Sequence, residues 1–124
     1  MHGGPPCCTW SAARHRPGGP PPIRDRSQLF GLPHLRQKFV LSCNRGSEIA
    51  LHYLDLMMGV LTCGGFASWE HPDDRGCKPF PSWWITPQWR ALVDEFQLVE
   101  ARFHQCDFGT PTKKPTRLGG ELLR

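Results

Sequence analysis

A proline- and glycine-rich run at positions 17–22, Pro-Gly-Gly-Pro-Pro-Pro, constrains the fold of this chain more than any other feature. Proline lacks the backbone N–H that helices and sheets need, and glycine weakens both. Residues 1–35 share this composition and add several arginines, so we predict one long loop there. We also expect this loop to be poorly ordered in the isolated chain and Cys7 to be exposed. Residues 36–124 are left to form the folded domain.

Helical periodicity begins after this loop. From about 37 to 61, apolar residues recur mostly at intervals of three, four and seven, as an amphipathic helix requires, and the glycine pair at 64–65 ends it. A second helix is predicted over 87–96, with Thr86 as its N-cap and Pro87 at its first position. Both predicted helices carry an apolar stripe that another layer must cover.

Three strands are predicted around these helices. Residues 66–70 form a short apolar run, and residues 99–106 alternate between apolar and polar side chains. After a turn at 109–111, residues 116–118 can pair back as a last strand. The order of elements predicts an α/β fold in which about three strands share one sheet and two helices pack against it.

Composition limits the kind of protein. With 124 residues the chain is of single-domain size, and its formal net charge of +4 permits a polyanionic partner, although such a small excess more often serves solubility. The six cysteines include no Cys-x-x-Cys pair, so no disulfide framework is predicted. No apolar run reaches the roughly 18 residues of a membrane span. We therefore expect an intracellular protein of the cytoplasm or nucleus that has reduced thiols and no membrane contact.

Three short motifs carry the chemical information. They are Gly-Pro-Pro-Cys-Cys-Thr-Trp-Ser at 4–11, Trp-Glu-His-Pro at 69–72 and Cys-Asp-Phe-Gly-Thr-Pro-Thr-Lys-Lys-Pro-Thr-Arg at 106–117. In this order and spacing they resemble the second half of a cytosine-C5 DNA methyltransferase. That family has a Gly-x-Pro-Cys-x-x-aromatic-Ser loop, a glutamate at the end of the next strand, and a Gly-x-Pro turn that leads into basic residues. The resemblance implies a partial, Rossmann-like methyltransferase sheet.

The resemblance also implies roles for single residues. Cys7 matches the nucleophile that attacks C6 of cytosine, a step that needs a soft, partly ionised group at the mouth of a pocket. Glu70 matches the carboxyl group that bonds the ring nitrogen and exocyclic amine of a flipped-out cytosine. The residues implied to bind nucleic acid are Ser11, Arg14, Lys113, Lys114 and Arg117.

The chain departs from the family pattern at several points. Cys8 stands where the family usually has a polar residue, and His71-Pro72 replaces the usual Asn-Val. The family's glutamine and Arg-x-Arg pattern are not reproduced near the basic turn. Each motif taken alone has a simpler interpretation: a cysteine in a proline-rich loop, a solvated glutamate at a strand end, and a lysine pair at a solvated turn.

The cofactor that the resemblance implies is S-adenosylmethionine, and the glycine-rich loop and acidic residues that hold it belong to the half that this chain does not match. The strand expected before the cysteine loop is also absent from the sequence pattern. The first hypothesis is therefore a truncated or split methyltransferase-like protein, derived from a split gene, a mobile element or a truncated gene. It is expected to be inactive in methyl transfer by itself and to act on DNA only with a complementing half. The alternative is a non-enzymatic, small basic module that binds nucleic acid or a protein.

Two further features favour structural roles. The spacings from His104 to Cys106 and from Cys63 to Cys77 fit no common zinc site, so no metal is predicted. The tryptophans at 83, 84 and 89 could stack on bases, but tryptophans more often cover a small core.

Overall fold

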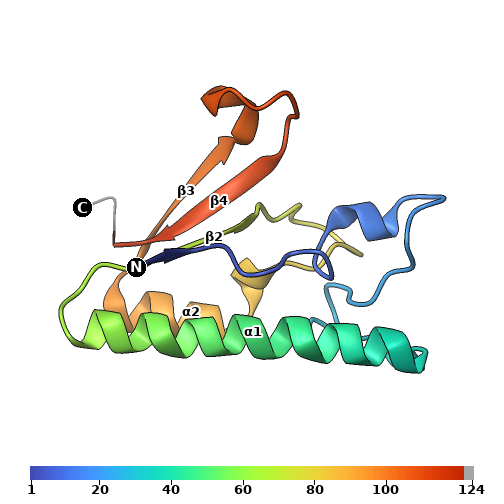
Figure 1. Ribbon diagram of the computed structural model, residues 1–124, viewed down its shortest axis with the longest axis horizontal. Coiled ribbons are helices and arrows are strands. Elements are labelled where there is room, and N and C mark those ends of the chain that lie inside the picture. Colours follow the sequence, from blue (N-terminus) through green and yellow to red (C-terminus); the bar gives the residue numbers. More distant parts are fainter. Residues whose placement is uncertain (122–124) are drawn as a thin grey trace.

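The computed structural model describes residues 1–121, which form a mixed α/β fold with a four-stranded sheet and two α-helices (Figure 1). In chain order the elements are β1 (His2–Gly3), η1 (Ala12–His15), α1 (Gln37–Thr62), β2 (Ser68–Pro72), η2 (Trp83–Ile85), α2 (Pro87–Phe96), β3 (Val99–His104), η3 (Gln105–Phe108) and β4 (Pro115–Gly120). The elements η1, η2 and η3 are short 3₁₀ turns.

The sheet has the strand order β1-β2-β4-β3. Strands β1 and β2 are parallel, whereas β4 pairs antiparallel with both β2 and β3. Both helices lie along the same side of the sheet (Figure 1). The ring of Trp69 on β2 contacts Tyr53 of α1 and Trp89 of α2, so one aromatic side chain connects the sheet to both helices.

The two predicted helices are confirmed. The apolar stripe of α1 packs inward at Cys43, Gly46, Ala50, Leu54, Met57 and Leu61. At the start of α2 the Thr86 hydroxyl accepts a hydrogen bond from the Trp89 backbone N–H at 3.2 Å, as an N-cap does. In the part of the chain that the structure describes, neither helix is long and apolar enough to cross a membrane.

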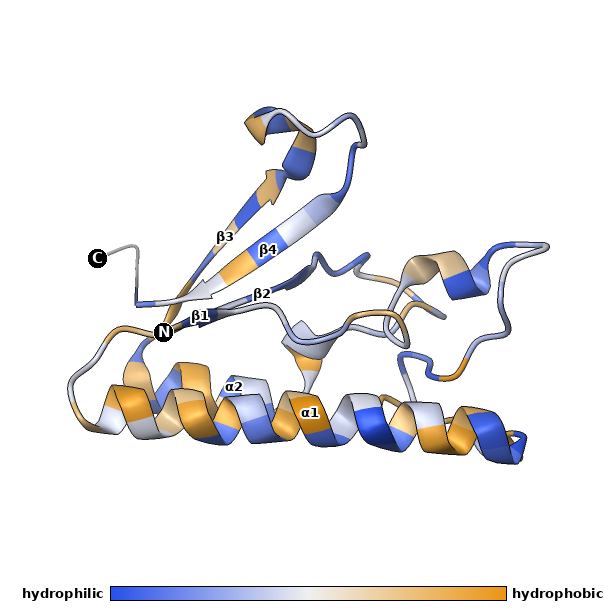
Figure 2. Cartoon of the chain, in the orientation of Figure 1, coloured by the Kyte–Doolittle hydropathy of each residue, from blue (hydrophilic) through white to orange (hydrophobic). Residues whose placement is uncertain are grey.

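The three predicted strands are present with shifted ends. Strand β2 lies two residues further along than predicted, and β4 extends over Pro115–Gly120. The alternation along β3 is visible in Figure 2, but this strand ends at His104 because residues 105–108 turn into η3. Local periodicity could not detect this turn, which the Asp107 carboxylate stabilises by accepting a hydrogen bond from the His104 N–H at 3.0 Å.

Strand β1 corrects the expectation that no strand precedes the cysteine loop. His2 pairs with Ser68 and Gly3 with Trp69, in parallel with β2. The backbone N–H of Ser68 also donates to the carbonyl of Met1 at 2.8 Å. Two residues are too few for a periodic pattern, so only pairing with β2 reveals this strand.

Residues 1–35 contain little regular structure, as predicted, but the expectation that they are poorly ordered is not what the structure shows. Thr9, Trp10, Ile23 and Arg24 from this segment are all buried. The Arg24 guanidinium donates to the Cys43 carbonyl on α1 at 3.0 Å. A few buried side chains therefore hold the loop against the domain, a possibility that its average composition hides.

Tryptophans form the centre of the core. The rings of Trp69 and Trp83 are stacked with centroids 4.5 Å apart, and Trp84 meets Trp89 edge to face at 5.0 Å. Gly119 on β4 permits this packing, because a Cβ there would overlap the rings of Trp89 and Trp84. The structural interpretation of Trp83, Trp84 and Trp89 is thus confirmed, because their rings, like that of Trp69, are buried at 0 to 1% exposure.

Candidate functional site

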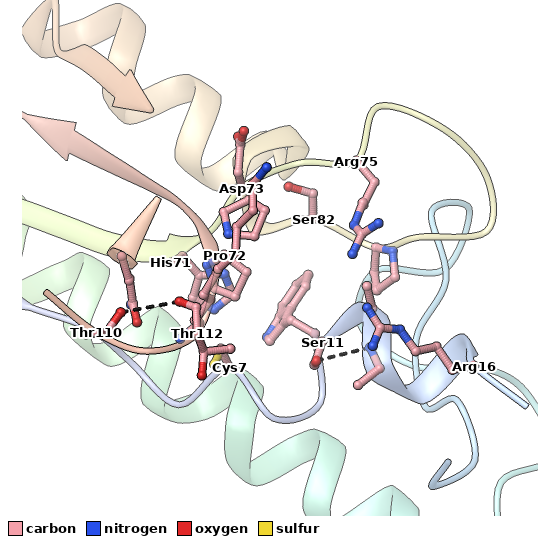
Figure 3. Close-up of a pocket in the computed structure, with 18 residues that line it drawn as sticks. Cys7, Ser11, Arg16, His71, Pro72, Asp73, Arg75, Ser82, Thr110 and Thr112 are labelled. Carbon is pink, nitrogen blue, oxygen red and sulfur yellow. Dashed lines mark hydrogen bonds between the residues drawn. The ribbon is translucent and has the colours of Figure 1, made fainter. Parts of the chain in front are cut away.

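A pocket of about 590 Å³ lies beyond the ends of β1 and β2, a volume within the usual range for small-molecule sites. Its walls come from three distant parts of the sequence: the cysteine loop and η1, the segment that leaves β2, and the turn between β3 and β4. Parallel strands of open α/β sheets present their carboxyl ends to such a crevice. The fold thus unites parts of all three sequence motifs around one cavity (Figure 3).

Positive charge dominates the side chains around this pocket. The cationic lining residues are Arg16, Arg75, Lys113 and Lys114. Within the described residues, none of these four forms an ion pair. We refer to them below as the four pocket cations. Unpaired cations at the wall of a concave site favour an anionic ligand.

Asp73 is the one acidic residue among the lining residues, and its charge is already balanced. Its carboxylate lies 2.8 Å from the Arg117 guanidinium and 3.5 Å from that of Arg102. Asp73 therefore does little to offset the four pocket cations.

Cys7 lines the pocket and is half-buried, rather than fully exposed as expected. Its carbonyl accepts a hydrogen bond from the Trp10 N–H at 2.9 Å, which closes a turn directly after the cysteine. The adjacent Cys8 is exposed and does not line the pocket. The turn thus distinguishes two cysteines that are neighbours in the sequence.

Glu70 does not line the pocket. Its carboxylate accepts a hydrogen bond from Gln105 Nε2 at 3.3 Å and lies 3.8 Å from His2 Nε2. Side chains alternate between the two faces of a strand, so Glu70 and His71 point to opposite sides of β2. Gln105 itself lines the pocket, so Glu70 contacts a lining residue without facing the cavity.

His71 is a lining residue that sequence patterns did not single out. It is buried, and burial followed by the nearby charges of Lys114 and Arg24 lowers the pKa of its imidazole to about 3. The ring is therefore neutral near pH 7. Its position in the sequence could have identified it. His71 directly follows Glu70, and because side chains alternate along β2, it shares a face with Trp69.

The remaining predicted site residues have different environments. Ser11 lines the pocket and caps η1 by accepting from the Ala13 N–H at 3.2 Å. Arg14 points elsewhere and donates to the carbonyls of Cys8 and Pro21 at 2.8 and 2.9 Å. Of the residues predicted to bind nucleic acid, Ser11, Lys113 and Lys114 therefore line the pocket.

Arg117 is buried and engaged in ion pairs instead of facing the pocket. Its guanidinium contacts the carboxylates of Asp73 and Glu100 at 2.8 and 3.0 Å and lies over the Trp84 ring at 5.2 Å. With its charge balanced inside the fold, Arg117 supports the sheet and is not available to a phosphate.

No metal cluster is present in the described residues, where no three His, Cys, Asp or Glu side chains are grouped so that they could hold an ion. All six cysteines are free thiols. S-adenosylmethionine, which the family resemblance implies, carries a positive sulfonium centre. The four pocket cations disfavour such a centre, so the residues around Cys7 do not fit this cofactor.

Comparisons of this chain with protein-family models, curated proteins and solved structures find no match. The chemistry of the pocket and the three motifs are therefore the basis for any functional inference.

Proposed function

We propose that this chain binds a nucleotide of DNA in the pocket, as the catalytic half of a cytosine-C5 methyltransferase-like protein. One observation carries the proposal: Cys7 from the beginning of the sequence and Lys113 and Lys114 from near its end line the same pocket. Long cationic side chains are suited to phosphate, and a half-buried thiol beside them is suited to a base.

The order of strands supports the finer assignment to a partial Rossmann-like sheet. Strand β1 runs parallel to β2, and α1 connects them, which is the βαβ arrangement of doubly wound folds. The cysteine loop follows β1, and the Glu-His-Pro segment ends β2. Both motifs therefore lie where such sheets bind their ligands.

The proposed chemistry begins at Cys7. Its thiolate forms a bond to C6 of cytosine, and the electron pair of the C5–C6 double bond moves to C5. At C5 that pair takes up a proton from water. A donor held by a partner chain would supply a methyl group there instead, because the pocket itself does not suit the sulfonium donor. Water then removes a proton from C5, the electron pair of that C–H bond re-forms the C5–C6 double bond, and the bond between C6 and sulfur breaks to release Cys7 as a thiolate.

The addition step can be tested without a methyl donor. Incubation of the protein with a cytosine-containing oligodeoxynucleotide in heavy water should exchange the C5 hydrogen for deuterium, as measured by mass spectrometry. Cys7→Ser should abolish the exchange, whereas Cys8→Ser, which changes an exposed residue outside the pocket, should retain it. Exchange that survives Cys7→Ser would overturn the assignment of the nucleophile.

A second candidate is a non-enzymatic module that binds nucleic acid. It is favoured by the position of Glu70, whose carboxylate is bonded to Gln105 and lies outside the pocket wall. Glu70 then does not line the cavity in which Cys7 would hold a base, and it cannot protonate that base directly. Binding of the oligodeoxynucleotide with no exchange at C5 would support this module over the enzyme.

A further inference from the structure

His71 is a buried histidine in the pocket wall, and its imidazole makes no hydrogen bond within the described residues. The residue is only 4% exposed. Ser82, the other buried polar residue of the wall, accepts a hydrogen bond from the Trp84 N–H at 3.2 Å. The enclosed side-chain polar atoms without a partner in the described residues are Trp10 Nε1, Trp69 Nε1, Trp83 Nε1 and His104 Nδ1. The His71 nitrogens are not among them, so they are open to a ligand in the pocket.

Aromatic packing holds the His71 ring in place. The ring meets Trp10 edge to face with centroids 6.0 Å apart, and it is tilted against Trp69 at 6.3 Å. These contacts fix the ring by packing and involve no hydrogen bond. Figure 3 draws His71 near Cys7 and Thr112, with Arg16 and Arg75 on another side of the pocket.

The charge state of His71 indicates what it can bind. Burial lowers the pKa of the imidazole to about 3, as do Lys114 and Arg24 to a smaller extent, so the ring is neutral in the physiological range. A neutral imidazole has one donor and one acceptor, and no described residue determines which nitrogen carries the proton. It is suited to an uncharged donor–acceptor edge, which every nucleobase has. A phosphate is better matched by the four pocket cations.

We propose that His71 recognises the base of the bound nucleotide by a hydrogen bond to its polar edge, while the four pocket cations hold the phosphate. This inference rests on the proposed function, because it names the residue that contacts the base in that same pocket. Glu70, to which the family resemblance gives this task, lies outside the pocket wall. His71 is thus a ligand-binding residue whose contribution depends on the presence of a base.

Two probes separate the base from the phosphate: deoxycytidine monophosphate and 2-deoxyribose 5-phosphate, each titrated into the full chain by NMR. His71→Phe keeps a ring for Trp10 and Trp69 but removes the nitrogens. It should weaken deoxycytidine monophosphate binding about tenfold and leave sugar phosphate binding unchanged. Lys113→Ala should weaken both, and His52→Phe, an exposed change on α1, should alter neither.

The same titrations show which idea fails. If deoxycytidine monophosphate binds the wild type and His71→Phe equally, or if His71→Phe weakens both probes equally, His71 does not read the base and the proposed function still stands. If neither probe nor an oligodeoxynucleotide binds the wild type, the proposed function fails and this inference fails with it. A ring ¹⁵N shift of His71 on addition of deoxycytidine monophosphate to the wild type tests the contact without a variant, and an unchanged shift would overturn it.

Discussion

The guanidinium of Arg24 lies over the indole of Trp10, 4.1 Å from the ring centroid, and both side chains are buried. The indole forms part of the pocket wall. Arg24 has no carboxylate partner among the described residues and instead donates to Thr9, Leu29, Ser47 and Cys43. This stack therefore connects the long loop, the first helix and the pocket.

Replacing Arg24 should loosen that connection. Arg24→Met keeps apolar bulk beside Trp10 but removes every hydrogen bond of the guanidinium. We expect the free energy of unfolding to fall by about 3 kcal/mol, because hydrogen bonds to charged groups contribute about 1.5–3 kcal/mol each and methionine packing offsets part of the loss. Urea unfolding measures the stability, and limited proteolysis should cut residues 1–35 faster.

Arg45→Met is the matched control, since Arg45 is an exposed arginine on α1. It should leave both measurements unchanged. Equal proteolysis of the two variants would show that contacts other than Arg24 hold the loop.

Two glycines inside α1 should respond in opposite ways to alanine. At Gly46 a Cβ would lie 3.1 Å from Thr9 Oγ1 and 3.3 Å from Arg24 Nη2, whereas at Gly59 it would meet nothing within 4 Å. Alanine favours a helix over glycine by about 1 kcal/mol. Gly59→Ala should therefore stabilise the protein by up to about 1 kcal/mol.

Gly46→Ala should instead lower stability by about 1–2 kcal/mol, because displacement of Arg24 outweighs the gain in helix propensity. Thermal unfolding of the two variants side by side measures the difference. A stabilising Gly46→Ala would mean that the loop shifts freely and does not pack on α1 as described.

Stability should fall as the pH drops below 6.5. The pKa of His71 is lowered from 6.5 to about 3 by burial and by the charges of Lys114 and Arg24. Between these values the unfolded chain binds the proton and the folded chain does not, so acid favours unfolding by up to about 1.4 kcal/mol per pH unit. Urea unfolding at pH 7.5 and 5.0 measures this loss.

The control is His71→Phe, which should show a smaller loss over the same interval. The interval lies above the titration of Asp74, whose pKa is lowered from 3.8 mainly by its hydrogen bond with Arg26. An identical pH dependence in wild type and His71→Phe would assign the effect to other groups.

The lysine pair should control the salt dependence of oligodeoxynucleotide binding. Each phosphate contact to single-stranded DNA contributes about 0.7 to the slope of log K against log salt concentration. Lys113→Ala with Lys114→Ala should therefore reduce the slope by about 1.4. Arg14→Ala, which removes a cation bonded within the loop, should leave the slope unchanged, and an equal reduction there would argue for a diffuse electrostatic surface.

Local sequence signals predicted those elements whose stabilising interactions are local. Helix α1 follows from its apolar period and α2 from its Thr86 and Pro87 start, and both lie within a residue of the prediction. The alternation of β3 was equally readable. In each case neighbouring residues in the chain supply the pattern, so no knowledge of distant partners is required.

The motifs alone determined which side chains could carry chemistry, but the tertiary structure decided which of them share a pocket. Cys7 and Lys114 meet there, whereas Arg117 is paired with Asp73 inside the fold. His71 lines the pocket and Glu70 does not, which depends on which face of β2 packs against the helices. Strand pairing and burial depend on residues that are distant in the sequence. A local sequence pattern therefore does not reveal which side chains face the core and which face the pocket or solvent.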